Sequence, residues 1–257
     1  MKRVLRHPFR FAVRIAWFTT EIIFAAFGFV VLLCFRRGEA STLARACCLQ
    51  RHARRMLRVM ATDVSVRGRV PNCGLLVSNH VSYLDILVLS SITPAIFVAK
   101  SEVRRWPVFG WLARRAGTLF IERAKRGDVA RVNDEVARFL EAGLLLVIFP
   151  EGTSSDGRQV LPFKSSLLEP VVRRRHPLSV AHISYEVEDG DAREDVCYWG
   201  EMTFGPHLLK LLSKRRVWAS VAFTAVEPGA GCRKELARQL HSEVSRLKSA
   251  REAQLTA

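Results

Sequence analysis

Acidic residues are scarce in this sequence. The 257 residues include 24 Asp and Glu against 40 Lys and Arg, which gives a formal net charge of +16 at pH 7. Residues 1–60 contain 12 Lys or Arg and two Glu, so the net charge of this segment is +10. Such an excess of positive charge predicts an anionic partner, which is either a nucleic acid or a membrane surface.

Several patterns that define other classes of protein are missing. The six cysteines form no Cys-x-x-Cys pair and have no histidine at zinc-ligand spacing. We therefore expect reduced thiols facing the cytoplasm, no metal site and no cofactor. RNA-binding, zinc-finger and helix-turn-helix signatures are absent, which argues against a nucleic-acid partner. The G-x-S-x-G motif of many serine hydrolases is absent too.

One long apolar segment occupies residues 16–35 and contains a single charge, Glu21. As a helix it would reach about 30 Å, the thickness of a bilayer core. A cleaved signal peptide fits poorly because no small-residue cleavage site follows. Basic residues flank both ends, so the positive-inside rule gives no clear orientation. The helix either spans the bilayer or dips into one leaflet and returns, which would keep both flanks on the cytoplasmic face of the cell membrane.

Residues 46–60 have the pattern of a basic amphipathic helix, with arginines on the sides away from the apolar positions. This pattern suits an anionic lipid interface, although a surface helix packed on a core has the same pattern. We expect residues 1–60 to form membrane-anchoring helices, arranged as a hairpin, and residues 61–257 to form the catalytic domain. The apolar positions are Ala46, Leu49, Ala53, Met56 and Met60.

Beyond residue 60, short apolar runs alternate with helical patterns, which predicts an α/β fold with a mixed, largely parallel sheet flanked by helices. In such folds, functional groups lie on loops beyond the carboxyl ends of strands. Strands are expected near residues 64–66, 75–77, 96–99, 118–121, 144–149, 179–184, 196–199 and 217–223. Helices are expected at residues 83–92, 107–115, 128–142, 163–173 and 234–247.

Three polar clusters each follow an apolar strand. In NHVSYLD, Asp85 follows His80 by five residues, so its carboxylate can fold back onto the imidazole from the first turn of a helix. This pair suits general-base catalysis, although a histidine in a helix cap or at the edge of a core is the structural alternative. In GTLFIER, Arg123 ends a strand and offers a fork of donors suited to phosphate. In VIFPEGTSSDG, Pro150 and Gly152 stop a strand before a turn rich in hydroxyl groups.

The order and spacing of these clusters resemble the glycerolipid acyltransferase family that makes phosphatidic acid from lysophosphatidic acid. The family's first motif is His-x4-Asp, commonly preceded by Asn; its second ends in Phe-Ile-x-Arg; its third is Phe-Pro-Glu-Gly-Thr. The resemblance covers residues 75–165. The matching residues are Asn79, His80, Asp85, Gly117, Phe120, Ile121, Arg123, Phe149, Pro150, Glu151, Gly152 and Thr153.

The resemblance implies acyl transfer from an acyl thioester, either acyl-CoA or acyl carrier protein, to the free hydroxyl of a lysophospholipid. His80 would be the general base and Asp85 would orient its imidazole. Backbone N–H groups near the first motif would stabilise the oxyanion. The substrate-binding residues expected are Asn79, Arg123, Glu151, Gly152, Thr153, Ser154 and Lys164.

Two positions depart from the family pattern. Ser154 stands where many members have arginine, and Ala181 and His182 occupy a fourth motif that usually contains proline. The EGTSSDG variant also resembles members that acylate lyso-ornithine lipid, an acceptor without phosphate. We expect lysophosphatidic acid as the acceptor, with lyso-ornithine lipid as the alternative. A thioester or lipid hydrolase and a non-catalytic basic membrane-binding protein are more distant alternatives.

Overall fold

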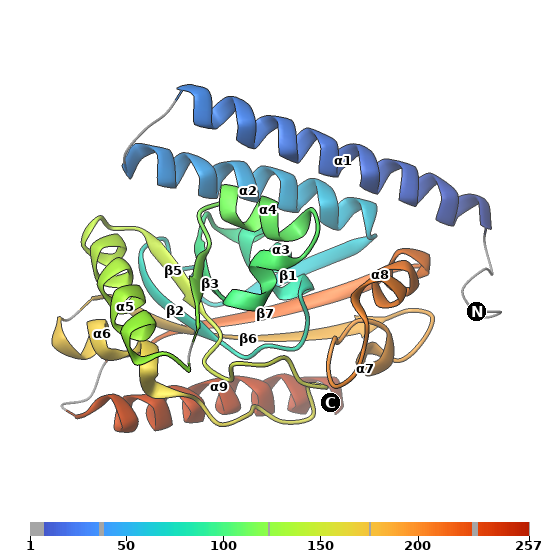
Figure 1. Ribbon diagram of the computed structural model, residues 1–257. Coiled ribbons are helices and arrows are strands. Elements are labelled where there is room, and N and C mark those ends of the chain that lie inside the picture. The colour runs from blue at the N-terminus through green and yellow to red at the C-terminus, as the bar shows by residue number, and fades with distance from the viewer. Residues whose placement is uncertain (1–7, 36–38, 123, 175, 228–230, 257) are drawn as a thin grey trace.

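The fold is built on a seven-stranded sheet with the strand order β1-β7-β6-β2-β5-β3-β4 and helices on both faces (Figure 1). The computed structural model describes residues 8–35, 39–122, 124–174, 176–227 and 231–256. Every strand pair is parallel except β6 with β7, so the predicted mixed, largely parallel sheet is confirmed. The strands are β1 (Thr62–Arg67), β2 (Gly74–Ser78), β3 (Ile96–Lys100), β4 (Leu119–Ile121), β5 (Leu145–Ile148), β6 (Leu178–Val187) and β7 (Val217–Ala225).

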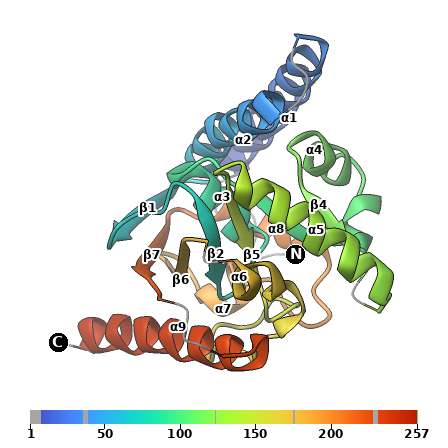
Figure 2. The same ribbon diagram turned by 90° about the vertical axis from the view of Figure 1, so that its left-hand side faces the viewer.

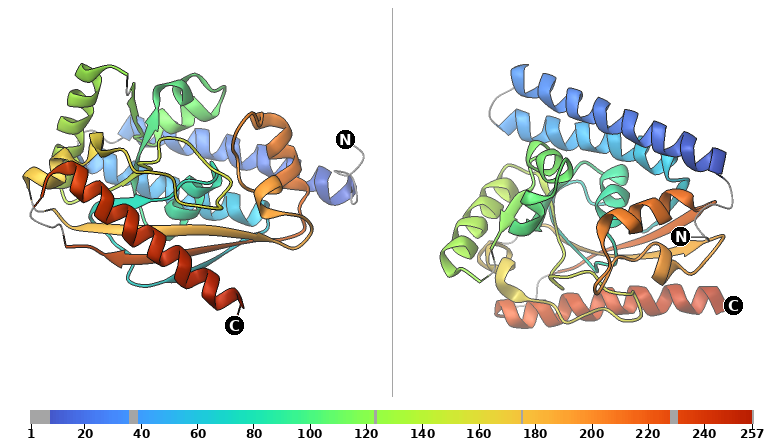
Figure 3. Two further views of the ribbon diagram at one scale, coloured as in Figure 1. Left: turned by 90° about the horizontal axis from the view of Figure 1, so that it is seen from below. Right: turned by 45° about the vertical axis from the view of Figure 1, so that its right-hand side comes forward.

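Helices lie on both faces of the sheet. Helices α2 and α3 pack on one face, and α5 and α9 pack on the other. Figure 2 shows α9 on the side of the molecule opposite to α1 and α2, and Figure 3 shows α9 crossing the sheet in the view from below. Two 3₁₀ turns occupy Ser101–Arg105 and Ser165–Leu167. The helices are α1 (Pro8–Phe35), α2 (Glu39–Val59), α3 (Leu84–Ile92), α4 (Phe109–Arg115), α5 (Arg126–Glu141), α6 (Glu169–Arg173), α7 (Ala192–Asp195), α8 (Phe204–Ser213) and α9 (Arg233–Thr256).

Two expectations for single elements are wrong. Residues 196–199 are not a strand: Val196 and Cys197 are buried after α7, and residues 197–199 have no regular structure, with the Tyr198 N–H donating to the Val81 carbonyl. The start of this apolar run is buried by packing against the first motif and not by sheet pairing. The helix expected at 163–173 is divided into a 3₁₀ turn and the short α6, because Pro170 has no N–H and disfavours helical geometry before it. Helix α8 was not expected.

The sheet separates two apolar layers. On one side, Met56 of α2 and Leu84 of α3 pack against β2, β6 and β7. On the other side, Val136 of α5 and Leu240 of α9 pack against β2, β3 and β5. All five residues of β2 are buried, as expected for a central strand of a parallel sheet with both faces covered. The carboxyl end of β2 therefore lies at the centre of the molecule.

Helices α1 and α2 form a hairpin that lies along the rest of the protein (Figure 1). The apolar face of α2, including Ala53 and Met56, is buried against α3 and β1, as in an ordinary surface helix. Near the start of α1, Arg10 donates to the carbonyl of Ser213 and Arg14 to the carbonyl of Leu212, at the end of α8. Cationic groups stabilise the negative end of a helix dipole. The boundary expected near residue 60 stays a prediction.

Candidate active site

The first motif is a turn between β2 and α3. His80 lies two residues after β2, and Asp85 lies in the first turn of α3. His80 Nδ1 is 2.8 Å from Asp85 Oδ2, and the same oxygen accepts the N–H groups of Val81 at 2.8 Å and Ser82 at 3.0 Å. Asp85 is fully buried, whereas 21% of the His80 side chain is exposed. The predicted contact between imidazole and carboxylate is therefore present at the surface of a buried turn.

This geometry determines how the imidazole can react. Asp85 Oδ2 already accepts two backbone N–H groups, so it acts as an acceptor toward His80 as well, and Nδ1 of His80 carries the proton that faces it. The other nitrogen, Nε2, then has the lone pair that can accept a proton from a substrate. The ring stacks on Phe149, with 4.2 Å between the ring centroids, which restricts its orientation. The pair is therefore arranged as a base with its orienting carboxylate.

The third motif lies against the first because β5 and β2 are neighbours in the sheet. The Glu151 carboxylate oxygen Oε1 accepts the N–H of His80 at 3.1 Å, and the Ser155 N–H donates to the His80 carbonyl at 3.0 Å. Gly152 has a φ of +75°, a conformation that favours glycine. Glu151 of the third motif and Ser155, two residues after it, thus hold the N–H and the carbonyl of His80.

Glu151 is itself an unusual carboxyl group. It is 3% exposed, and its second oxygen, Oε2, has no hydrogen-bond partner among the described residues. Burial raises the pKa of Glu151 to about 8, although the backbone N–H groups of His80 and Leu161 act in the opposite direction. The side chain is therefore largely a neutral carboxylic acid at pH 7, able to donate a hydrogen bond from one oxygen.

The raised pKa of Glu151 predicts that folding stability falls as the pH rises. The folded protein holds this proton more tightly than the unfolded chain, so the stabilisation is complete below about pH 4.5 and is lost as the pH passes 8. Since one pKa unit corresponds to about 1.4 kcal/mol, the wild type should lose roughly 2 to 4 kcal/mol between pH 5 and pH 9 relative to Glu151→Gln. Denaturant unfolding of both proteins measures this difference. Parallel pH profiles would contradict the prediction.

The other expected binding residues have different environments. Asn79 is buried, and its amide both donates to and accepts from the backbone of Ile183 at 2.9 and 2.8 Å, so its polar atoms hold β2 to β6. Thr153 and Lys164 are exposed, and Ser154 is half-buried. Arg123 lies outside the described residues. The role of each in binding substrate stays a prediction.

Two features of the site differ from the sequence-based expectation or were absent from it. Backbone N–H groups near the first motif were expected to stabilise an oxyanion, but those of Val81 and Ser82 donate to Asp85 because its carboxylate folds over the turn. Tyr185 was not singled out, yet its hydroxyl donates to Asp85 Oδ1 at 2.7 Å. The sequence feature that could have identified Tyr185 is the alternation of side-chain directions along β6, which places Tyr185 on the same face of the strand as Ile183.

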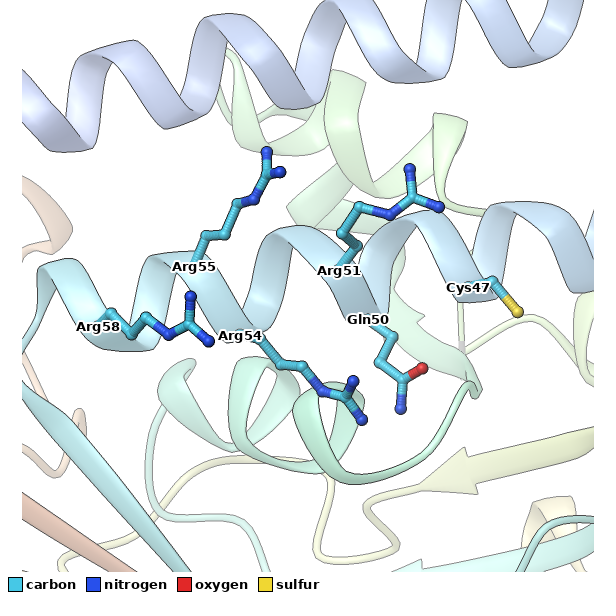
Figure 4. Close-up of a pocket in the computed structure, with 6 residues that line it drawn as sticks. All are labelled: Cys47, Gln50, Arg51, Arg54, Arg55 and Arg58. Carbon is cyan, nitrogen blue, oxygen red and sulfur yellow. The ribbon is translucent and has the colours of Figure 1, made fainter.

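A separate hollow of about 300 Å³ lies along α2, beside α1 (Figure 4). It contains no residue of the three motifs. Figure 4 shows the side chains of Arg51 and Arg55 extending toward α1 and that of Arg54 extending away from α1. The lining residues are Cys47, Gln50, Arg51, Arg54, Arg55 and Arg58.

Comparison with known proteins agrees with this geometry. A sequence model of the Acyltransferase family matches residues 62–183. The lyso-ornithine lipid O-acyltransferase of Brucella abortus is 40% identical over 189 residues, which cover 67% of this chain and 70% of that protein. That of Pseudomonas aeruginosa is 36% identical over 192 residues, or 74% of each chain. The 1-acyl-sn-glycerol-3-phosphate acyltransferase of Neisseria gonorrhoeae is 32% identical over 160 residues, or 62% of each.

The fold has a counterpart among solved structures. The 1-acyl-sn-glycerophosphate (LPA) acyltransferase of Thermotoga maritima superimposes with a TM-score of 0.65 over 96% of this chain and 98% of that one, at 20% sequence identity. Fold and relatives together define an acyl-transferring enzyme. The chain belongs to the lysophospholipid and 1-acylglycerol-3-phosphate acyltransferase family and is an O-acyltransferase. The non-catalytic alternative is thereby set aside.

Proposed function

We propose that this enzyme transfers an acyl group from an acyl thioester, acyl-CoA or acyl carrier protein, to the free hydroxyl of a lysolipid, with His80 as the general base. The observation that carries this proposal is the 2.8 Å contact between the partly exposed imidazole and the buried Asp85. An alcohol attacks a thioester slowly until a base takes its proton, and an imidazole oriented by a carboxylate is suited to that task.

The reaction needs no covalent enzyme intermediate. The acceptor oxygen attacks the thioester carbonyl carbon while Nε2 of His80 takes the hydroxyl proton. Asp85 stabilises the resulting imidazolium through Nδ1. The carbon–sulfur bond then breaks, and the departing thiolate takes the proton from His80, which restores the neutral imidazole and releases a thiol and the diacyl product. The neutral acid of Glu151 lies against the His80 backbone and would help to shape the acceptor site.

For the acceptor, we propose lyso-ornithine lipid. Ser154 stands where an arginine would favour phosphate, and two relatives that match at least two thirds of their length are lyso-ornithine lipid O-acyltransferases. Lysophosphatidic acid, the acceptor favoured by the sequence motifs, is the second candidate. It is favoured by the match at Arg123 and by the relative in Neisseria gonorrhoeae, which is a 1-acyl-sn-glycerol-3-phosphate acyltransferase.

The acceptor proposal predicts how kcat/KM changes with the residue at position 154. The wild type should prefer lyso-ornithine lipid, and Ser154→Arg should shift the preference about tenfold or more toward lysophosphatidic acid, because a charge-assisted hydrogen bond to phosphate is worth roughly 1.5 to 3 kcal/mol. Initial rates with both acceptors measure this. Gln159→Arg, at an exposed position of the same segment outside the expected binding residues, is the control and should not shift the preference.

Arg123→Ala separates the two acceptor candidates. If the acceptor site binds a phosphate, Arg123→Ala should lower kcat/KM for lysophosphatidic acid about 10- to 150-fold. Adding Ser154→Arg to this variant should then restore part of the lost kcat/KM. The proposed acceptor requires a wild-type preference for lyso-ornithine lipid, which Arg123→Ala does not reverse. A wild type that prefers lysophosphatidic acid would contradict the acceptor proposal and would leave the chemistry of His80 intact.

We also propose that α1 binds the enzyme to a membrane. Pro8–Leu32 is long and apolar enough to cross one. However, one side of α1 is buried on α2 at Ala25 and Phe29, while the opposite side exposes Ile23 at 63% and Phe27 at 67%. A helix packed lengthwise on its protein presents an apolar stripe, which suits contact in the plane of one leaflet. This arrangement favours a hairpin that dips into one leaflet, and it argues against a helix that spans the whole bilayer.

The arginines of α2 suit the same membrane contact. Arg51 and Arg55 are exposed beside α1 and, with Arg54 and Arg58, line the hollow in Figure 4. Guanidinium groups at this position would bind the phosphates of anionic lipids while α1 enters the apolar layer. The cytoplasmic face is the side on which acyl-CoA and acyl carrier protein are found. Residues 1–60 would then anchor the catalytic residues next to a lipid acceptor.

A further inference from the structure

The hydroxyl of Tyr185 lies in the interior of the candidate active site, although Tyr185 belongs to none of the three motifs. It projects from β6, which is the neighbour of β2 in the sheet. The alternation of β6 places Tyr185 on the side of Ala181 and Ile183, where the strand packs against the layer that contains α3. Its hydroxyl donates to Asp85 Oδ1 at 2.7 Å, across 100 residues of sequence.

The two oxygens of Asp85 have different partners. Oδ2 accepts His80 Nδ1 and the N–H groups of Val81 and Ser82, while Oδ1 accepts the hydroxyl of Tyr185. Because Asp85 is fully buried, each oxygen depends on protein donors and not on bulk water. The tyrosine bond therefore fixes, together with the N–H groups of Val81 and Ser82, the rotation of the carboxylate about its last bond, and that rotation aims Oδ2 at the imidazole.

We infer that Tyr185 is a positioning residue for acyl transfer: it holds the Asp85 carboxylate so that one oxygen stays on His80 while its own hydroxyl occupies the other. This inference rests on the proposed role of His80 as the general base. Burial and the neighbouring Asp85 raise the pKa of Tyr185 well above its usual range, so the hydroxyl stays protonated and remains a donor at every pH at which the enzyme works.

The hydrogen bond has a second consequence, which is electrostatic. A donor on Oδ1 draws negative charge away from Oδ2 and so weakens the stabilisation of a charged imidazole. If the donor is removed, the protonated form of His80 becomes more stable. The acid limb of the pH profile of kcat, where the base becomes protonated, should then move to higher pH. A tyrosine that only filled space in the core would leave this limb unchanged.

The chain contains a matched control. Tyr83 is also a largely buried tyrosine and lies between His80 and Asp85 in the first motif, but its hydroxyl binds His207 Nδ1 at 2.9 Å, and Nε2 of His207 binds the Cys197 carbonyl at 2.9 Å. Tyr83→Phe therefore removes a buried hydroxyl bond without touching Asp85. Comparing it with Tyr185→Phe separates a general loss of buried hydrogen bonding from the loss of this particular contact.

The experiment compares wild type, Tyr185→Phe and Tyr83→Phe by kcat, by KM for both substrates and by the pH profile of kcat. Tyr185→Phe should lower kcat roughly 10- to 100-fold, the range for losing a hydrogen bond to a charged group, with KM changed less than threefold and the acid limb moved to higher pH. Tyr83→Phe should leave the acid limb in place. A folded Tyr185→Phe enzyme with wild-type kcat and an unmoved limb would overturn the inference.

A second measurement applies even if Tyr185→Phe is unstable. The sequence contains three tyrosines, so the Tyr83→Phe/Tyr198→Phe variant leaves Tyr185 as the only one. Biosynthetic fluorotyrosine in that variant makes the hydroxyl a stronger donor, which should move the acid limb to lower pH; no movement would overturn the inference. His80→Ala distinguishes the two proposals. If His80→Ala is inactive while Tyr185→Phe behaves like the wild type, only the positioning role of Tyr185 is overturned. If His80→Ala is fully active, the roles of His80 and Tyr185 are both overturned.

Discussion

His80→Ala is expected to lower kcat by about 10²- to 10⁴-fold, the usual contribution of a general base, without unfolding the protein. The structure supports the second part of this expectation. The His80 side chain is at the surface of the turn, and without it Asp85 still accepts the N–H groups of Val81 and Ser82 and the hydroxyl of Tyr185. Asp85→Asn should cause a loss of similar size, because it removes the charge that stabilises the imidazolium.

The measurement uses labelled acyl thioester with and without lysolipid. Product that forms only with acceptor indicates a transferase, whereas free fatty acid would indicate that water takes the place of the hydroxyl. His176→Ala is a suitable control, since His176 lies just before the start of β6, and the site lies at the other, carboxyl end of the parallel strands β2 and β6. A near-normal rate in His80→Ala would exclude His80 as the base, whatever the acceptor.

The combined change Ile23→Ser, Phe24→Ser and Phe27→Ser is expected to release the enzyme from membranes. These side chains lie on the exposed side of α1, and burying each one in an apolar layer contributes about 1.5 to 3 kcal/mol. Losing all three should lower the partition coefficient by roughly a thousandfold or more, while the packed side of α1 is unchanged. Sedimentation with lipid vesicles measures the bound fraction.

Salt and a control variant test the nature of this attachment. High salt should weaken the contribution of the α2 arginines but should not release the wild type, because burial of apolar surface is insensitive to screening. Val66→Ser with Val172→Ser changes exposed apolar side chains elsewhere and should leave binding unaltered. Complete extraction of the wild type by salt would show that the attachment is electrostatic and would contradict the proposed role of α1.

The sequence by itself determined the features that depend on neighbours along the chain. The contact between His80 and Asp85 followed from a spacing of five residues, which one turn and the start of a helix can close. The α/β fold followed from the alternation of apolar runs and helical patterns, and α1 followed from one long apolar segment. Each of these rests on local periodicity or short spacing, which a single segment shows on its own.

Only the tertiary structure decided which distant groups meet at the site. Glu151 reaches the backbone of His80 because β5 is the neighbour of β2, and Tyr185 reaches Asp85 across 100 residues because β6 is the neighbour on the other side. The burial of Val196 and Cys197 without a strand and the packing of α2 on α3 have the same origin. Strand order in a parallel sheet is set by crossovers and by packing of whole layers, so no local pattern in the sequence specifies these neighbours.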